Sequence, residues 1–132
     1  MTFNKNYLLP RILIGLMALM MAAATIPAYG DPTTNPGLTE LQEPAVSLGL
    51  TAGAFLGRQM ALILIALIGA VVGQRHLVMI GGFAMMFMNG HDAIFMGLMG
   101  GPQVAAIAGL VFAILGAVAI FLVWRKPAEV AA

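Results

Sequence analysis

Four long runs of apolar residues, separated by short polar stretches, make up most of this chain. The first run covers residues 12–26 and has further apolar residues on both flanks. Because the hydrocarbon core of a bilayer is about 30 Å thick, one helical crossing takes about 20 apolar residues. The pattern therefore predicts an all-α protein with four membrane-spanning helices, at about residues 8–29, 48–72, 77–95 and 104–124.

The composition supports a membrane protein. Hydrophobic residues make up 61% of the chain and charged residues 8%, whereas charged residues form about a quarter of a typical soluble domain. A length of 132 residues fits a single domain. We therefore expect one transmembrane domain over residues 1–132, a four-helix bundle with the lipid bilayer as its surroundings.

The first apolar run has two interpretations. The basic residues Lys5 and Arg11, the apolar run and the small residues Ala28 and Gly30 together resemble a signal peptide with its cleavage site. Alternatively the run is the first membrane helix, since its apolar flanks bring it close to spanning length and Arg11 can extend to the membrane surface. We favour a helix over residues 8–29.

Acidic and basic residues lie in different connections between the apolar runs. Residues 30–47 contain three of the five acidic residues and several prolines, which predicts an extracytoplasmic loop. Since basic residues concentrate on the cytoplasmic side of membrane proteins, both termini are expected in the cytoplasm. The basic residues are Lys5, Arg11, Arg75, Arg125 and Lys126; the acidic residues are Asp31, Glu40 and Glu43.

Small residues recur at spacings of four along the second and fourth runs. In lipid, such spacing lets helix backbones approach closely, so that van der Waals contacts hold the helices together. The pattern is consistent with packing inside one bundle, and also with an interface to a second copy or to another subunit. The predicted packing positions are Gly49, Gly53, Gly57, Gly69, Gly73 and Gly109.

Two charged residues interrupt the apolar runs. Arg58 lies about 15 residues before the turn at residues 73–76, and Asp92 lies about 15 residues after it, so both lie about 22 Å from the inner edge of a straight hairpin. Each charge alone costs at least about 2.5–3.5 kcal/mol at the membrane centre, less near an interface. The sequence therefore predicts an intramembrane ion pair between Arg58 and Asp92, either as a structural clamp or beside a polar cavity.

Asn89, His91 and Asp92 together form a candidate polar site in the third run. Methionines recur around them with helical spacing, which we interpret as packing rather than as a copper site. The chain has no cysteine, and none of the common catalytic motifs is present. We expect no catalytic set, no metal site and no cofactor, and the absence of a basic cluster argues against nucleic-acid binding.

Two segments carry a resemblance to a known family. LLPRILIGLMAL near the start, and GRQMALILIALIGAVVGQRHLVMIGGFAMMFMNGHDAIF further on, resemble DoxX-like proteins, which are small four-helix bacterial membrane proteins. The matching positions are Arg11, Gly57, Arg58 and Asp92. The resemblance implies a protein of the bacterial cytoplasmic membrane, whose relatives are mostly of unassigned activity and in some cases linked to redox or quinone-associated complexes.

Three kinds of function are compatible with these features. The absence of a catalytic set and the glycine positions favour a non-enzymatic accessory protein, packing with itself as a homo-oligomer or with a larger membrane complex. A second possibility is an oligomeric small-molecule or proton-coupled transporter, in which His91 or Asp92 titrates. A third is a redox subunit that handles a quinone-like substrate at the polar residues of the third run.

Overall fold

The computed structural model describes residues 7–35, 37–38, 49–101 and 103–126. Within these residues every regular element is a helix, and four of the helices are long and apolar enough to cross a membrane. The elements are α1 (Leu8–Thr25), the short 3-10 helices η2 (Pro27–Tyr29) and η3 (Pro32–Thr34), α2 (Leu50–Val72), α3 (Arg75–Met99) and α4 (Gln103–Trp124).

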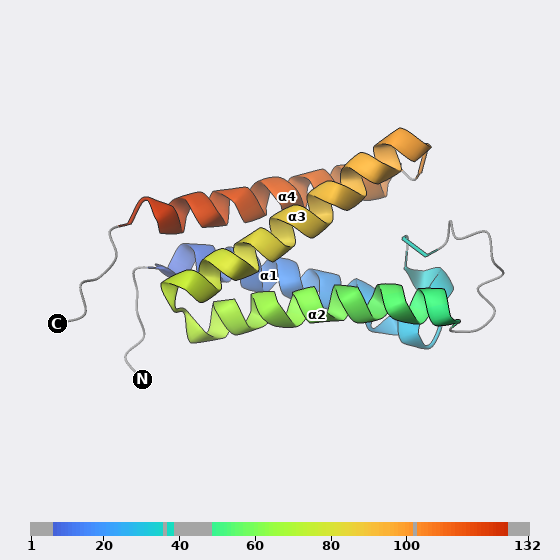
Figure 1. Ribbon diagram of the computed structural model, residues 1–132, viewed down its shortest axis with the longest axis horizontal. Helices are drawn as coiled ribbons and strands as arrows, with labels where there is room; N and C mark the ends of the chain where they lie inside the picture. Colours follow the sequence, from blue (N-terminus) through green and yellow to red (C-terminus); the bar gives the residue numbers. More distant parts are fainter. Residues whose placement is uncertain (1–6, 36, 39–48, 102, 127–132) are drawn as a thin grey trace.

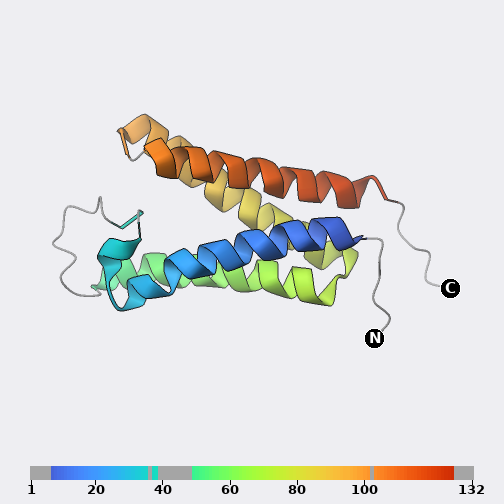
Figure 2. The ribbon, with the colours of Figure 1, turned by 180° about the vertical axis from the view of Figure 1, so that it is seen from behind.

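The four long helices form two antiparallel pairs (Figure 1). Helices α1 and α2 lie side by side, and α3 runs obliquely from the end of α2 to the start of α4, against which it packs (Figures 1 and 2). As a result, α2 and α3 lie close at their shared turn and diverge away from it. The start of α1, the end of α4 and the α2–α3 turn lie at one end of the bundle, which we call the inner end; the other end is the outer end.

Glycines with positive φ end the second and third helices. At Gly73 (φ 71°) the backbone N–H donates to the Gly69 carbonyl at 3.0 Å, and Gly100 (φ 75°) ends α3 in the same left-handed conformation. A residue without Cβ adopts this conformation at little cost. Helix α3 therefore runs from residue 75 to 99, longer at both ends than the predicted 77–95.

Three groups of buried apolar side chains form the core. The central group joins α1, α2 and α3, the inner group adds residues of α4, and a small outer group joins η2, residue 38 and α2. The central group is Met17, Ala18, Ile63, Ala66, Met85 and Met88; the inner group is Tyr7, Ile14, Val78, Ala119 and Val123; the outer group is Ala28, Leu38 and Leu56.

The outward surfaces of the four helices are largely apolar. In the most apolar stretch of each helix, only between 22% and 44% of the residues are buried inside the protein. Large apolar side chains such as Leu98 (80% exposed) and Val104 (82% exposed) lie on these surfaces. A contiguous apolar surface of this extent is typical of a protein that contacts lipid or other membrane helices.

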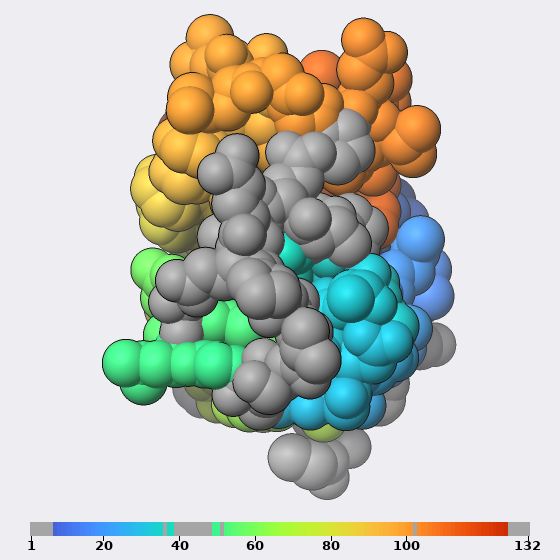
Figure 3. Space-filling view, turned by 90° about the vertical axis from the view of Figure 1, so that its right-hand side faces the viewer, coloured from blue at the N-terminus to red at the C-terminus, as the bar shows by residue number. Residues whose placement is uncertain are grey.

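The predicted loop at 30–47 is described only at residues 30–35 and 37–38. There the chain is folded onto the bundle, since Leu38 is 1% exposed and packs with Ala28 and Leu56. Figure 3 shows this end of the molecule, with the α3–α4 turn above and the 3-10 helices and the start of α2 below.

Candidate functional site

The ion pair predicted between Arg58 and Asp92 is not formed within the chain. Asp92 Oδ1 lies 3.1 Å from His91 Nδ1 instead. Arg58 is exposed on α2, and no ion pair or hydrogen bond reaches it from the described parts of the chain. Both charged residues lie inside helices that are long and apolar enough to span a membrane.

The divergence of α2 and α3 explains why the pair is absent. Near the turn the two helices touch, because a Cβ on Gly69 would lie 2.5 Å from the Leu77 carbonyl oxygen. Further out the two helices separate (Figure 1). The prediction placed the two charges at equal depth on helices assumed to stay in contact, and the oblique course of α3 separates them.

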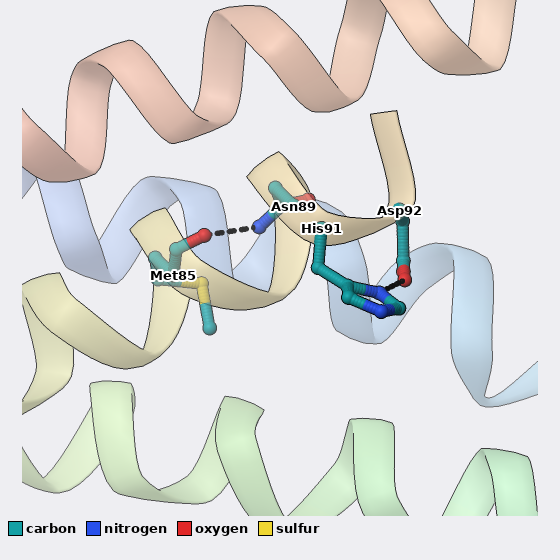
Figure 4. A network of polar contacts seen from close by, with 4 residues as sticks. All are labelled: Met85, Asn89, His91 and Asp92. Carbon is teal, nitrogen blue, oxygen red and sulfur yellow. Dashed lines mark hydrogen bonds and ion pairs between the residues drawn. The ribbon is translucent and has the colours of Figure 1, made fainter. Parts of the chain in front are cut away.

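The candidate polar residues of α3 divide between two environments. The Asn89 side chain is buried and donates to the Met85 carbonyl at 2.7 Å (Figure 4). Met21 Sδ lies 3.5 Å from the same amide nitrogen. His91 and Asp92 lie on the side of α3 that points away from α4 (Figure 4), with side chains 62% and 32% exposed. Asn89 therefore belongs to the packed interior, and only His91 and Asp92 are accessible.

Aromatic rings flank His91 along the exposed surface of α3. The rings of Phe83, Phe87, His91 and Phe95 stack in succession with centroids 5.9, 6.3 and 6.1 Å apart. The three phenylalanines are 54–61% exposed. Since residues four apart lie on one side of a helix, the four rings form a continuous outward ridge, which we call the aromatic ridge. The spacing of these four residues is visible in the sequence, but only the structure shows that their rings are exposed.

The methionines near this site serve different purposes. Met85 and Met88 belong to the buried central core, whereas Met99 is 71% exposed at the end of α3. Among the described residues, no group of three or more His, Asp or Glu side chains is arranged to hold a metal ion. As members of the core, Met85 and Met88 fill apolar space with flexible side chains.

Arg11 is the polar residue whose role the sequence did not reveal. It is 7% exposed, and its guanidinium donates from Nε to the Ala70 carbonyl at 2.7 Å and from Nη2 to the Val71 carbonyl at 2.8 Å. A Cβ on Gly73 would lie 2.6 Å from the guanidinium carbon. Arg11 therefore caps the carboxyl end of α2, where free carbonyls and the negative end of the helix dipole favour a cation.

A second polar network ties the outer end together. The Thr25 hydroxyl donates to the Met21 carbonyl at 2.8 Å, and its oxygen lies 3.2 Å from Gln59 Oε1, which accepts from Asn35 Nδ2 at 3.3 Å. Thr25 and Asn35 are 1% and 4% exposed. The Gln59 amide oxygen on α2 therefore lies between a side chain of α1 and one that follows η3.

Asp31 holds the start of η3. Its Oδ1 accepts hydrogen bonds from Thr33 Oγ1 at 2.6 Å and from Thr33 N at 3.0 Å. The hydroxyl bond is the larger cause, and the backbone bond the second, of a pKa for Asp31 that is lowered from its ordinary value.

The predicted packing glycines also divide into two sets. Gly69 and Gly109 lie against backbone atoms of α3, and Gly73 lies against Arg11. Gly53 and Gly57 face open space, and Gly49 precedes α2 as its N-cap residue. The closest α3–α4 approach involves Gly116, where a Cβ would lie 2.7 Å from Met86 N and 2.8 Å from the Gly82 carbonyl oxygen; the predicted set did not include it.

The accessible groups define what this surface can do chemically. A histidine beside a carboxylate can bind and release a proton, and a carboxylate can pair with a cation from another chain. Within the described residues, no hydroxyl side chain is hydrogen-bonded to His91 in the manner of an activated nucleophile.

Comparison of the chain with protein-family models, curated proteins and solved structures found no match.

Proposed function

We propose that this chain is a multi-pass protein of the bacterial cytoplasmic membrane, with all four long helices spanning the bilayer and both termini on the cytoplasmic side. The length and apolar surface of the four helices support insertion. The distribution of basic residues supports the orientation, and the resemblance to DoxX-like proteins supports the bacterial location.

Within the membrane, we infer that the protein is a non-enzymatic accessory subunit that assembles with itself or with a larger complex. One observation carries this proposal: Arg58, His91 and Asp92 lie on outward surfaces of helices that would span the bilayer. Ionisable side chains rarely face lipid, because each costs about 2.5–3.5 kcal/mol or more near the bilayer centre. Contact with a protein surface that pairs or hydrogen-bonds these groups offsets that cost.

The test is purification of the tagged chain from its own membranes in a mild detergent, followed by native mass spectrometry. We expect a homo-oligomer or a complex with other subunits, stable to dilution. A chain that is monomeric in lipid nanodiscs, and that elutes with no other subunit, would contradict the proposal. A monomer in nanodiscs is stronger evidence than a monomer in detergent, since detergent alone can dissociate weak assemblies.

The His91–Asp92 pair favours a second candidate, proton-coupled transport by an oligomer. A carboxylate 3.1 Å from an imidazole nitrogen places two groups that can bind a proton side by side on an accessible surface. In proteoliposomes, Asp92→Asn would then abolish proton uptake driven by a substrate gradient while circular dichroism and gel filtration stay unchanged. Uptake that is equal in wild type, Asp92→Asn and empty liposomes would eliminate this candidate.

A further inference from the structure

We propose that the partner of this chain is a second copy, and that the two copies pack through the outer halves of α2 and α3, with Arg58 of each copy paired with Asp92 of the other. The inference rests on the proposed assembling role and specifies its partner and contact. It replaces the intrachain ion pair, which the structure does not contain, with an intermolecular one.

Arg58 lies on a surface that is shaped for a neighbouring helix. It is exposed, and the residues one turn to either side, Ala54 and Ala61, are also exposed, as is the adjacent Gly57. The exposed neighbours Ala54, Gly57 and Ala61 are thus small, and a Cβ on Gly57 would meet no atom of the described residues within 4 Å. Another helix can therefore approach this part of α2 closely enough to place a carboxylate beside Arg58.

Asp92 supplies the matching charge on a different helix of the same molecule. Its side chain is 32% exposed, and its partner within the chain is His91, which is itself 62% exposed. A neutral histidine leaves the carboxylate charge uncompensated, whereas an arginine compensates it and can form two parallel hydrogen bonds. The aromatic ridge beside Asp92 gives the contact an apolar rim that would fit against the small residues of α2.

Depth and direction are compatible with this contact. Arg58 lies about 15 residues before Gly73, which is about 22 Å along α2. Asp92 lies slightly further along α3, but the oblique course of α3 reduces its distance from the inner end (Figure 1). Two copies inserted in the same orientation keep these depths, so Arg58 of one copy and Asp92 of the other lie at similar levels.

A two-fold axis along the membrane normal completes the arrangement. In a symmetric dimer the same surface of both copies takes part, and each contact occurs twice. Here α2 of one copy would face α3 of the other, with opposite chain directions, and both Arg58 side chains and both Asp92 side chains would be paired. A dimer therefore pairs all four charges, two Arg58 and two Asp92. In a monomer surrounded by lipid, Arg58 has no charge of opposite sign beside it.

Disulfide cross-linking in the membrane tests the geometry, because the chain contains no cysteine of its own. Two differently tagged copies, one carrying Ala54→Cys and the other Phe95→Cys, are co-expressed, and the membranes are oxidised. Ala54 and Phe95 lie one turn outward from Arg58 and Asp92 on their helices, so the charge pair stays intact. We expect a cross-linked dimer that carries both tags.

The matched control pairs Ala54→Cys with Ile107→Cys, because Ile107 is 63% exposed on α4 and, like Ala54 and Phe95, lies four residues from the outer end of its helix. It should give at most about a tenth of the cross-linked product. Equal cross-linking in both combinations overturns the proposal, as does no cross-linking in either.

Charge reversal tests the ion pair itself. Arg58→Asp and Asp92→Arg should each weaken dimerisation in liposomes at least about 30-fold, measured by energy transfer between labelled copies, since a broken desolvated pair is costly. The double variant should recover most of the affinity. Failure of the double variant to recover, with all three proteins folded by circular dichroism, overturns the proposal.

A steric variant covers the case in which a reversed charge prevents insertion. Gly57→Leu keeps both charges and adds a side chain where the protomer has open space, so it should leave the protomer folded and abolish the dimer. Gly97→Leu, at another position where a Cβ meets no atom, should leave the dimer unchanged.

The results distinguish failure of the proposed dimer contact from failure of the proposed accessory function. A homo-oligomer that forms without the cross-link, or a complex with other subunits only, overturns the dimer while the accessory function stands. A monomer in nanodiscs without any other subunit overturns both.

Discussion

At the residue scale, Arg11 shows how a charged side chain gains a place inside an apolar helix bundle. Its guanidinium lies between α1 and the end of α2, where it donates to two carbonyls that have no partner within their own helix. Gly73 leaves the space that the guanidinium occupies. The sequence indicated that Arg11 could extend to the membrane surface, and it could not indicate which helix end lies there.

Arg11→Ala is expected to destabilise the protein by about 2–4 kcal/mol, because two hydrogen bonds from a charged donor and the favourable helix-dipole contact are lost. Arg11→Lys should recover part of this, since an ammonium keeps the charge but not the two-pronged geometry. Unfolding in mixed micelles of increasing SDS content measures both changes.

The control is Arg125→Ala. Arg125 is exposed and lies over the Phe121 ring at 5.3 Å, so its loss should cost less than about 1 kcal/mol. Equal destabilisation by Arg11→Ala and Arg125→Ala would mean that the cap on α2 contributes nothing.

Asp31 gives a prediction that depends on pH. Its folded-state pKa is lowered from the ordinary value of 3.8 by the Thr33 hydroxyl and then by the Thr33 amide. The contribution of this carboxylate to stability is therefore present above the unfolded pKa and lost as the pH falls through the lower folded pKa. Thr33→Ala should move the pKa back toward 3.8, as followed by the Asp31 carboxyl carbon shift in NMR. Identical titrations of both proteins would exclude the hydroxyl as the cause.

At the element scale, glycines at similar spacings lie at helix contacts in some places and on the outward surface in others. The inner half of α2 meets α3 at Gly69, while its outer half leaves Gly53 and Gly57 without a neighbour. The α3–α4 pair stays in close contact further along, at Gly109 and Gly116. Similar sequence spacing thus gives an internal contact in one place and an outward surface in another, because Gly53 and Gly57 lie on a different side of α2 from Gly69.

Gly116→Ala and Gly57→Ala form a matched pair of substitutions. At position 116 the new methyl group would lie 2.7 Å from Met86 N, so the α3–α4 pair must shift, at a cost of about 1–3 kcal/mol. At position 57 no atom lies within 4 Å, so protomer stability should stay equal or rise by up to about 1 kcal/mol. The melting temperature of each protein in detergent checks both values. A lower melting temperature for Gly57→Ala than for Gly116→Ala would contradict the packing described.

At the scale of the whole molecule, the ends of α1 and α4 and the α2–α3 turn share one end of the bundle (Figure 1). Basic residues gather there, with Arg11, Arg75 and Arg125 all near this end, while Asp31 lies at the other. Under the positive-inside rule, this distribution supports the proposal that the inner end is the cytoplasmic one.

Single cysteines test this orientation in intact cells. Thr33→Cys should react with a membrane-impermeant maleimide applied from outside, because Thr33 is exposed at the outer end. Lys126→Cys should react only after the cells are opened. The reverse pattern would invert the topology. Labelling of both residues from outside would indicate another number of crossings between them. Removal of the first helix would leave the pattern unchanged, because α2, α3 and α4 all lie between Thr33 and Lys126.

The fold class was largely predictable because helix length and apolar composition are local properties. A run of about 20 apolar residues has few structural options in a bilayer, where every backbone polar group needs an internal partner. The sequence therefore identified four helices that are long and apolar enough to span a membrane, although α3 proved longer than predicted. Asn89, His91 and Asp92 were recognised together because polar residues are conspicuous in such a run.

Contacts between helices are different in kind, because they depend on crossing angles that no single run encodes. By itself the sequence determined which charges and glycines lie within the helices, and it determined their depth along each helix axis. Only the tertiary structure decided that Arg11 caps α2, that Asn89 is buried while His91 and Asp92 face outward, and that Arg58 stays apart from Asp92. The physical reason is the oblique course of α3, which brings it to α4 and carries it away from the outer half of α2.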